Sequence, residues 1–447
     1  MTPRAWEDWL QPLEEIIDSE RIRFSPLTFQ QSIMGIPGKR FIDPLPMDTG
    51  MGFPVFGPKK RWFEDIWENG VLVDRIPNEE IVNEYNRMLM LWKANERAYP
   101  VCSATLKDEP TKVTSEKVRV FQAAPVALSL HIRKYYLPIV RFLCANPIVS
   151  ECAVGLNAFA QEWDALMERA FEYDSDCGVL AWDYSKYDVR MSSQVTRAVL
   201  AAYIRLAERA GYCQEDLDIM KAMVNDIVHP LIDYNGVLLM AFNMNTSGNN
   251  ITVNINSTAG SLYVRMGLFD AVPEVEDFRD TLACMTYGDD FVGSLRKEYH
   301  DRFNFEVYQK FLARHCMKVT LPDKGDTSSA FMDVEDVDFL KRKSNFIPEL
   351  NLNIGKLNEN SIFKSLHANL KSKTESPSQV AASCVAGALH EWFAYGRDHY
   401  EMRREQMRTV CQMANLPLSV LDISFDDRVA HWRSKYHQSS GEQSTFI

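Results

Sequence analysis

Three features are scarce in this sequence: paired cysteines, long apolar runs and an excess of positive charge. Its nine cysteines are an odd number and include no CxxC pair, which argues against a disulfide framework or a zinc-type ligand cluster. No apolar run approaches the length of a membrane span and no signal peptide is evident, so we expect a soluble chain. The formal net charge of −12 argues against indiscriminate nucleic-acid binding, because a polyanion would need a locally basic channel.

Two acidic segments are the most informative feature that is present. Residues 285–294 read MTYGDDFVGS, in which apolar flanks and a Gly288-Asp289 turn predict a hairpin with Asp289 and Asp290 at its tip. Upstream, VLAWDYSKYDVRM predicts a strand that ends at Asp183, with Asp188 shortly after it. We expect the strand and the hairpin to bring Asp183 beside Asp289 and Asp290.

Carboxylates gathered in this way suit nucleotidyl transfer. In two-metal enzymes the ions activate the attacking group and stabilise the leaving group, and Mg²⁺ is bound through one or two carboxylates plus substrate phosphates. The ordinary alternative is that an aspartate pair merely makes a good turn. A tetrapeptide such as YGDD arises by chance in a chain this long roughly a few times in a thousand, so the neighbouring segments have to decide between the two interpretations.

A third segment lies between the two acidic ones and gives the chain a family resemblance. It reads NMNTSGNNITVNINS at residues 243–257, a Ser-Gly turn followed by a helix-like run. The chain resembles the RNA-dependent RNA polymerases of picorna-like positive-strand RNA viruses, with the motifs in the family's order. The matching residues are Asp183 and Asp188 in motif A, Ser247, Gly248, Thr252 and Asn256 in motif B, Tyr287 to Asp290 in motif C, Asp323 and Lys324 in motif D, Phe339 to Arg342 in motif E, Lys107, Lys112 and Arg119 in motif F, and Thr49 and Gly50 in motif G.

The resemblance implies a catalytic role for four of these residues. Asp183, Asp289 and Asp290 would bind two Mg²⁺ ions, for which Mn²⁺ can substitute. Lys324 would donate a proton to the departing pyrophosphate, a general-acid role that rests on the resemblance alone.

The resemblance also implies binding roles. The nucleotide-binding residues would be Lys107, Lys112 and Arg119 at the triphosphate, and Asp188, Ser247, Gly248, Thr252 and Asn256 around the ribose, whose 2′-hydroxyl distinguishes RNA precursors from DNA precursors. The RNA-binding residues would be Thr49, Gly50, Lys341 and Arg342.

Several of these residues also have an ordinary structural interpretation. The motif F cations fit a solvated loop equally well, since neighbouring acidic residues nearly cancel their charge. Asp188 could cap the helix that begins near Ser192. Lys341 and Arg342 could be an exposed charge cluster.

The expected fold class is α+β, a right-hand polymerase with fingers, a palm built on an antiparallel sheet, and a helical thumb. Length and hydrophobic content, 447 residues and 46%, agree with about three domain-sized units. The predicted limits are 1–175 for the fingers, 176–211 for the first part of the palm, 212–244 for a return into the fingers, 245–346 for the rest of the palm and 347–447 for the thumb. Helical spacing predicts helices over 125–143, 158–171, 192–210, 215–228, 302–315, 360–372, 379–396 and 398–414, and Asn235-Gly236 predicts a hairpin turn.

The resulting prediction is a viral RNA-dependent RNA polymerase that replicates a positive-strand genome. Its expected partners are an RNA template and primer, nucleoside triphosphates, a small viral protein primer and other replication proteins, at replication complexes in the host cytoplasm. Two alternatives stay open at this point. A reverse transcriptase shares the palm and the aspartate pair, although Asp188 and Asn256 argue against it, and a catalytically silent RNA-binding protein could keep the same fold.

Overall fold

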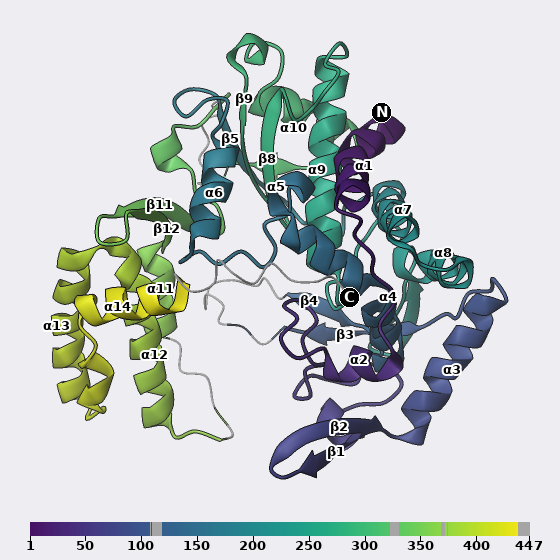
Figure 1. Cartoon of the computed structure of the whole chain (residues 1–447), viewed down its shortest axis with the longest axis horizontal. Coiled ribbons are helices and arrows are strands. Elements are labelled where there is room, and N and C mark those ends of the chain that lie inside the picture. Colours follow the sequence, from purple (N-terminus) through teal and green to yellow (C-terminus); the bar gives the residue numbers. More distant parts are fainter. Residues whose placement is uncertain (108, 110–118, 322–329, 368–371, 373, 437–447) are drawn as a thin grey trace.

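A four-stranded antiparallel sheet forms the centre of the computed structural model, which describes residues 1–107, 109, 119–321, 330–367, 372 and 374–436 (Figure 1). Its strand order is β10-β5-β9-β8. The strands are β5 (Val179–Tyr184), β8 (Leu282–Tyr287), β9 (Asp290–Leu295) and β10 (Val319–Thr320). The sheet carries the two acidic segments.

Both faces of this sheet are covered. Successive side chains of a strand point to opposite faces, and these strands are apolar at successive positions, so both faces are apolar. Leu180 and Trp182 face the core shared with helix α9 (Thr252–Ala271), whereas Val179 and Ala181 face helix α6 (Gln161–Ala170). Helix α10 (Phe305–Arg314) packs against α9. A sheet held between helices gives the acidic segments a rigid base.

A second four-stranded sheet, in the order β4-β3-β6-β7, lies in the lobe to the right of Figure 1. Strands β3 (Val101–Leu106) and β6 (Leu231–Tyr234) are parallel, so the sheet joins segments far apart in the sequence. Its outer strands are β4 (Val120–Ala123) and β7 (Val237–Met240). The chain between residues 29 and 228 also contains α2 (Phe29–Met34), β1 (Phe63–Glu68), β2 (Val71–Pro77), α3 (Glu79–Lys93), α4 (Val126–Ala145), α5 (Pro147–Ser150), α7 (Ser193–Ala210) and α8 (Gln214–Val228).

The C-terminal lobe has a core of its own. Trp392, Tyr400, Phe425 and Trp432 are buried in a cluster separate from the main core. Helix α12 begins where the sequence favours it, since Ser376 forms a capping box with Gln379. The elements are β11 (Arg342–Ile347), β12 (Leu352–Leu357), α11 (Glu359–His367), α12 (Pro377–Trp392), α13 (Arg397–Met413) and α14 (Phe425–Tyr436); short 3-10 helices elsewhere cover Lys59–Arg61, Lys297–Tyr299, Val334–Asp336, Phe393–Tyr395 and Leu418–Leu421.

The N-terminal helix α1 (Thr2–Ser19) is tied to the central sheet by a buried network of charges. Arg265 of α9 is fully buried; its guanidinium donates to Asp8 of α1 at 2.6 Å and to both carboxylate oxygens of Glu151 at 2.6 and 2.8 Å. The backbone carbonyl of Glu151 accepts hydrogen bonds from the N–H and the hydroxyl of Thr286 in β8. The network therefore joins α1, α9 and the strand that leads into the hairpin.

Most elements expected from periodicity are present. The hairpin at residues 282–295, the strand ending near Asp183, the helices over 192–210 and 215–228 and the hairpin turn at Asn235-Gly236 are confirmed. Helices α1, α3 and α14 and strands β11 and β12 were not predicted. The predicted limit at residue 346 divides the β11–β12 hairpin, and the domain limits stay predictions.

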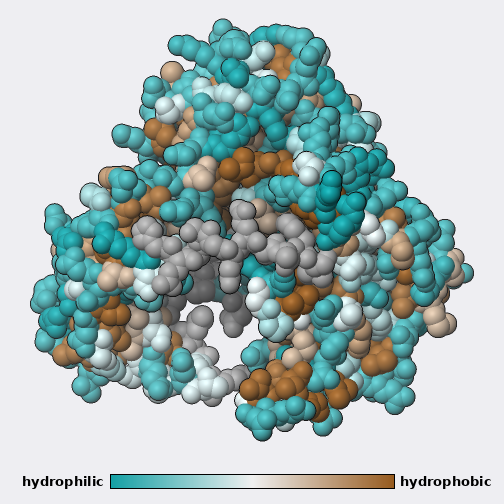
Figure 2. All heavy atoms as spheres, in the orientation of Figure 1, coloured by the Kyte–Doolittle hydropathy of each residue, from teal (hydrophilic) through white to brown (hydrophobic). Residues whose placement is uncertain are grey.

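The surface of the three lobes is mainly hydrophilic in the view of Figure 2. An exposed apolar patch lies at the β1–β2 hairpin, where Trp67 is 60% and Val71 is 63% exposed. Among the described residues, no helix is both long and apolar enough to span a membrane.

Replacing Arg265 with leucine should destabilise the fold strongly. Glu151 would stay buried without its main partner, and breaking a buried pair costs about 3–5 kcal/mol of unfolding free energy. Denaturant titration measures this. Arg302→Leu is the matched control, because Arg302 forms an exposed pair with Glu274 and its loss should leave the midpoint unchanged. Equal midpoints for the two variants would contradict the role of the network.

Candidate active site

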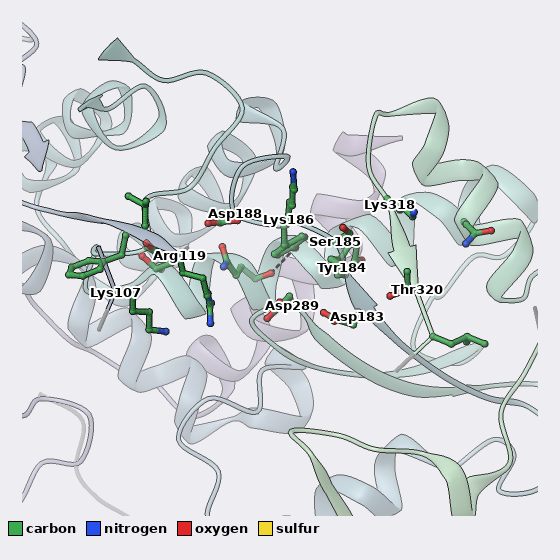
Figure 3. A pocket seen from close by; sticks show the side chains of 18 of the residues that line it. Lys107, Arg119, Asp183, Tyr184, Ser185, Lys186, Asp188, Asp289, Lys318 and Thr320 are labelled. Carbon is green, nitrogen blue, oxygen red and sulfur yellow. Dashed lines mark hydrogen bonds between the residues drawn. The ribbon is translucent and has the colours of Figure 1, made fainter. Parts of the chain in front are cut away.

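A cavity of about 1220 Å³ lies where the central sheet meets the β3–β4 hairpin (Figure 3). It gathers residues from six separate segments of the chain. Eight of the residues predicted from the sequence line it: Lys107, Arg119, Asp183, Asp188, Ser247, Thr252, Asn256 and Asp289.

The acidic residues are delivered by adjacent strands of the central sheet. Asp183 of β5 and Asp290 of β9 are directly paired in the antiparallel register, and Asp289 lies in the two-residue turn between β8 and β9. Gly288 precedes it with φ +62°, a conformation that favours glycine. Asp183 and Asp289 line the cavity, whereas Asp290 is not among its lining residues.

The hairpin turn is held from behind by hydrogen bonds. The N–H of Gly288 donates to the hydroxyl of Ser257 on α9 at 2.8 Å, and Ser257 is fully buried. The hydroxyl of Thr286 donates to the carbonyls of Glu151 and Ser257 at 2.7 and 3.0 Å. These bonds fix the position of Asp289 relative to α9.

Burial and mutual repulsion raise the pKa values of two carboxylates in the site. Burial raises the pKa of Asp289, and the charges of Asp183 and Asp188 raise it further. Burial, followed by the charges of Asp289 and Asp183, raises the pKa of Asp290 to about 7. Asp338, which sequence reasoning did not single out, adds to this repulsion. A half-buried cluster with excess negative charge fits a bound divalent cation.

The donor set also fits such an ion. Within the described part of the chain, no three histidine, cysteine or acidic side chains are already arranged to hold a metal. Mg²⁺ does not need such a cage, because it keeps several waters and takes one or two carboxylates together with substrate phosphates. Asp183 and Asp289 are the two carboxylates that share the cavity with such a substrate.

One end of the cavity is basic. Lys107 follows β3 and Arg119 precedes β4, and the N–H of Lys107 donates to the carbonyl of Arg119 at 2.9 Å, so the two side chains leave the same end of the hairpin. Both lie within ion-pair distance of Glu109, at 3.3 and 3.4 Å. Both cations are exposed, so the oxygens of a triphosphate can replace Glu109 as their partner.

A polar group suited to a ribose lines the cavity near Asp188. Asn245 connects this group: its N–H donates to the carbonyl of Asp188 at 2.8 Å and its side chain donates to the amide oxygen of Asn256 at 2.7 Å. Ser192 itself caps α7, so Asp188 is not needed as a helix cap and is available to a ligand.

Gly248 has a packing role. A Cβ there would lie 2.0 Å from the carbonyl oxygen of Gln122, which no side chain can do. The Gln122 side chain in turn accepts hydrogen bonds from the N–H and hydroxyl of Ser247 at 3.2 Å. The close approach joins the motif B turn to strand β4.

Comparison with known proteins agrees with this geometry. The sequence model of viral RNA-dependent RNA polymerases matches residues 12–402. The chain belongs to this family. Members of the family generally use divalent metal ions.

The relatives of this polymerase are parts of picorna-like virus polyproteins. It is 25% identical to the replicase polyprotein of Drosophila C virus over 88% of this chain and 23% of that protein. It is 23% identical to the genome polyprotein of Deformed wing virus over 85% of this chain and 14% of that protein. The chain thus spans a quarter or less of the length of these relatives.

A solved structure has the same fold. The Sicinivirus 3Dpol RNA dependent RNA polymerase aligns with a TM-score of 0.75 over 96% of this chain and 86% of that one, at 19% sequence identity. The right-hand α+β fold predicted from the sequence is confirmed.

Thr49 and Gly50 are predicted site residues that do not line the cavity. Thr49 and Gly50 accept hydrogen bonds from the buried ammonium of Lys59 at 2.6 and 2.7 Å. Burial lowers the pKa of Lys59 to about 8, and the charge of Arg133 adds to this effect. Thr49 and Gly50 thus hold a loop together here, and their contact with RNA stays a prediction.

Arg342 has partners within the protein. Its guanidinium forms a two-point ion pair with Glu391 of α12 at 2.8 and 2.9 Å, and it also donates to the carbonyl of Gly355. These contacts fix Arg342 between the β11–β12 hairpin and α12, and its contact with RNA stays a prediction. Lys341 is exposed in the preceding turn, and its role stays a prediction. Lys112 and Lys324 lie outside the described residues.

Besides Asp338 and Asn245, the site contains other residues that sequence reasoning did not single out. Ser257 and Gln122 position the hairpin and the motif B turn, and Lys186 and Lys318 line the cavity. Lys186 lies between Asp183 and Asp188 in the sequence, a signal that could have been used. No comparable sequence signal marks Ser257, because its contact with Gly288 exists only in the folded chain.

Asp290→Asn should stabilise the metal-free polymerase at high pH. The pKa of Asp290 is raised in the folded state to about 7, so the folded chain holds a proton that the unfolded chain releases near pH 4. Its contribution to stability is therefore present below about pH 4 and lost as the pH rises through about 7. Thermal midpoints in a chelator should favour the variant at about pH 8, with the difference disappearing toward pH 4.

The control for this experiment is Asp176→Asn, which changes an exposed aspartate near the same sheet. It should shift the midpoint little at any pH. If Asp290→Asn behaves like this control at high pH, the carboxylates are not repelling one another as described.

Proposed function

We propose that the polymerase extends an RNA primer on an RNA template, using two Mg²⁺ ions held by Asp183 and Asp289 with the help of Asp290. The observation that carries this proposal is the meeting of Asp183 and Asp289 in one cavity with a basic end and a ribose-type polar group. When bound, the two ions activate the primer 3′-hydroxyl for in-line attack on the α-phosphate and stabilise the leaving pyrophosphate; Mn²⁺ can take their place.

The protein's own residues orient the nucleotide. Lys107 and Arg119 bind triphosphate oxygens, with the planar guanidinium suited to two-point contact. The Gly288–Ser257 hydrogen bond keeps Asp289 in place as the nucleotide arrives. Lys324 protonates the departing pyrophosphate, and Lys112 adds to the triphosphate contacts, as the family resemblance implies.

Ribonucleotide selection belongs to the polar group near Asp188. Asp188 and Asn256, joined through Asn245, accept and donate hydrogen bonds at the ribose hydroxyls, and Thr252 and Ser247 border the same space. A deoxyribonucleotide would leave these polar groups without a partner, which costs binding energy.

The proposal also covers the wider setting of the polymerase. We include in the proposal a small viral protein primer, other replication proteins as partners, and a location at replication complexes in the host cytoplasm. The protein primer and the location rest on the sequence resemblance, and the polyprotein relatives support other replication proteins as partners.

Primer extension on a defined RNA template with Mg²⁺ tests the proposal. Ribonucleotides and deoxyribonucleotides are supplied in parallel, and Asp289→Asn serves as the inactive comparison. We expect template-dependent RNA growth that falls by about a thousandfold or more in the variant, because a metal ligand is lost. DNA growth would favour a reverse transcriptase. RNA binding without growth, by folded protein with and without a protein primer, would favour a silent RNA-binding protein.

Asp188→Ala and Asn256→Ala should each lower the preference for ribonucleotides. The ratio of kcat/KM for ATP to that for dATP is expected to fall by about tenfold, the worth of one hydrogen bond to a charged or buried partner. Asp176→Ala is the control and should keep the wild-type ratio. Unchanged ratios in both site variants would remove the ribose-sensing role.

A further inference from the structure

Two lysines line the active-site cavity without any role in the account so far. Strands β5 and β10 pair Tyr184 with Val319 and Asp183 with Thr320. The N–H of Ser185 donates to the carbonyl of Lys318 at 2.8 Å, which continues this pairing by one residue. Lys318 therefore lies opposite Ser185, the residue that precedes Lys186, and both lysines line the cavity.

Lys186 is held at this position by its backbone and its neighbour. It has φ +55°, a left-handed conformation that is uncommon for lysine. The next residue, Tyr187, is buried and donates a hydrogen bond from its hydroxyl to the carbonyl of Asn256 at 3.0 Å. The short turn between Asp183 and Asp188 therefore presents the exposed Lys186 side chain at its outermost point.

No described carboxylate neutralises either ammonium group. Within the described ranges, Lys186 and Lys318 have no carboxylate partner, whereas Lys107 and Arg119 share Glu109. Figure 3 places Lys107 and Arg119 at one end of the cavity and Lys318 at the other, with Lys186 and the aspartates between them. The cavity thus has a second basic wall, separate from motif F.

The position of this wall indicates its ligand. Lys186 lies between Asp183, at the reacting phosphate, and Asp188, at the ribose. In a nucleoside triphosphate the α-phosphate follows the ribose and the β- and γ-phosphates continue beyond it, and beyond Asp183 the cavity is lined by Thr320 and Lys318 (Figure 3). A lysine is a compact point charge on a flexible stem, which suits phosphates that move during the reaction.

We propose that Lys186 and Lys318 form a polyphosphate-binding site that takes the β- and γ-phosphates of the arriving nucleotide or the pyrophosphate that leaves. The proposal rests on the proposed polymerase function and adds residues that the sequence motifs do not include. Because both side chains are exposed, they act mainly on capture of the anion and less on the chemical step.

The test compares single and double variants. Lys186→Asn keeps a residue that tolerates the left-handed backbone, and Lys318→Gln removes the second charge. For the double variant we expect the KM for nucleotide to rise by about fivefold or more at low salt, with kcat changed by no more than about twofold. The effect should shrink toward 0.5 M salt because exposed charges are screened. If arginine replaces glutamine at position 318 of the double variant, so that the second change is Lys318→Arg, most of the lost affinity for nucleotide should return.

The matched control is Lys221→Gln, which removes an exposed lysine paired with Asp218 on α8. It should keep the wild-type KM. A control variant with the same rise in KM would show a general effect of net charge and would overturn the site.

Two inorganic probes distinguish the ligand sources. If the site captures the arriving nucleotide, the inhibition constant of tripolyphosphate should rise in the double variant. If it guides the leaving group, the inhibition constant of pyrophosphate should rise and pyrophosphorolysis should slow. A folded double variant with unchanged KM and unchanged inhibition by both anions would overturn the proposal.

The result also separates this inference from the proposed function. If the wild-type chain makes no RNA, the polymerase function fails. Calorimetric titration with tripolyphosphate then tests the anion site directly: weaker binding by the double variant supports it, and equal binding refutes it.

Discussion

Asp183, Asp289 and Asp290 repel one another at the end of the central sheet, and the surrounding structure holds them together against that repulsion. The antiparallel register places Asp183 opposite Asp290, and the turn that carries Asp289 is fixed by Ser257 and by the carbonyl of Glu151 through Thr286. Without these bonds the hairpin could relax away from the charge. Burial and this repulsion both raise the pKa values of Asp289 and Asp290, and a bound cation would oppose both effects.

The buried charges behind the site have the opposite character. Arg265 is matched by Glu151 and Asp8, so this network is satisfied where the catalytic cluster is not. Because it joins α1 and α9 to the strand before the turn, the N-terminal helix supports the same hairpin. The buried charges of the scaffold are thus paired with one another, whereas the carboxylates of the site are left for a ligand to pair with.

The acidic net charge of −12 is compatible with a nucleic-acid enzyme because the cavity has its own distribution of charge. Lys107 and Arg119 lie at one end, and Lys186 and Lys318 form a second basic wall. Attraction for phosphates is thereby confined to the place where it is useful. The rest of the surface can stay acidic and hydrophilic.

The sequence was sufficient to predict the palm, since its strands and turn are local patterns: an apolar run that ends at Asp183, and apolar flanks around Gly288-Asp289. It also predicted eight residues of the cavity through the family's motif order. It could not reveal contacts made only by the fold, such as Ser257 with Gly288 or Gly248 against Gln122. Arg342 shows the converse, because a basic residue in a binding motif is engaged by Glu391, 49 positions away.

The central claim is that Asp183 and Asp289 form a divalent-metal site for nucleotidyl transfer. The most direct measurement is anomalous diffraction from crystals of the polymerase with Mn²⁺, an RNA primer-template and a non-hydrolysable nucleotide. The account predicts two metal peaks about 4 Å apart, both contacted by Asp183 and Asp289. Metal peaks elsewhere, or a nucleotide bound in the cavity with no metal beside these carboxylates, would contradict it.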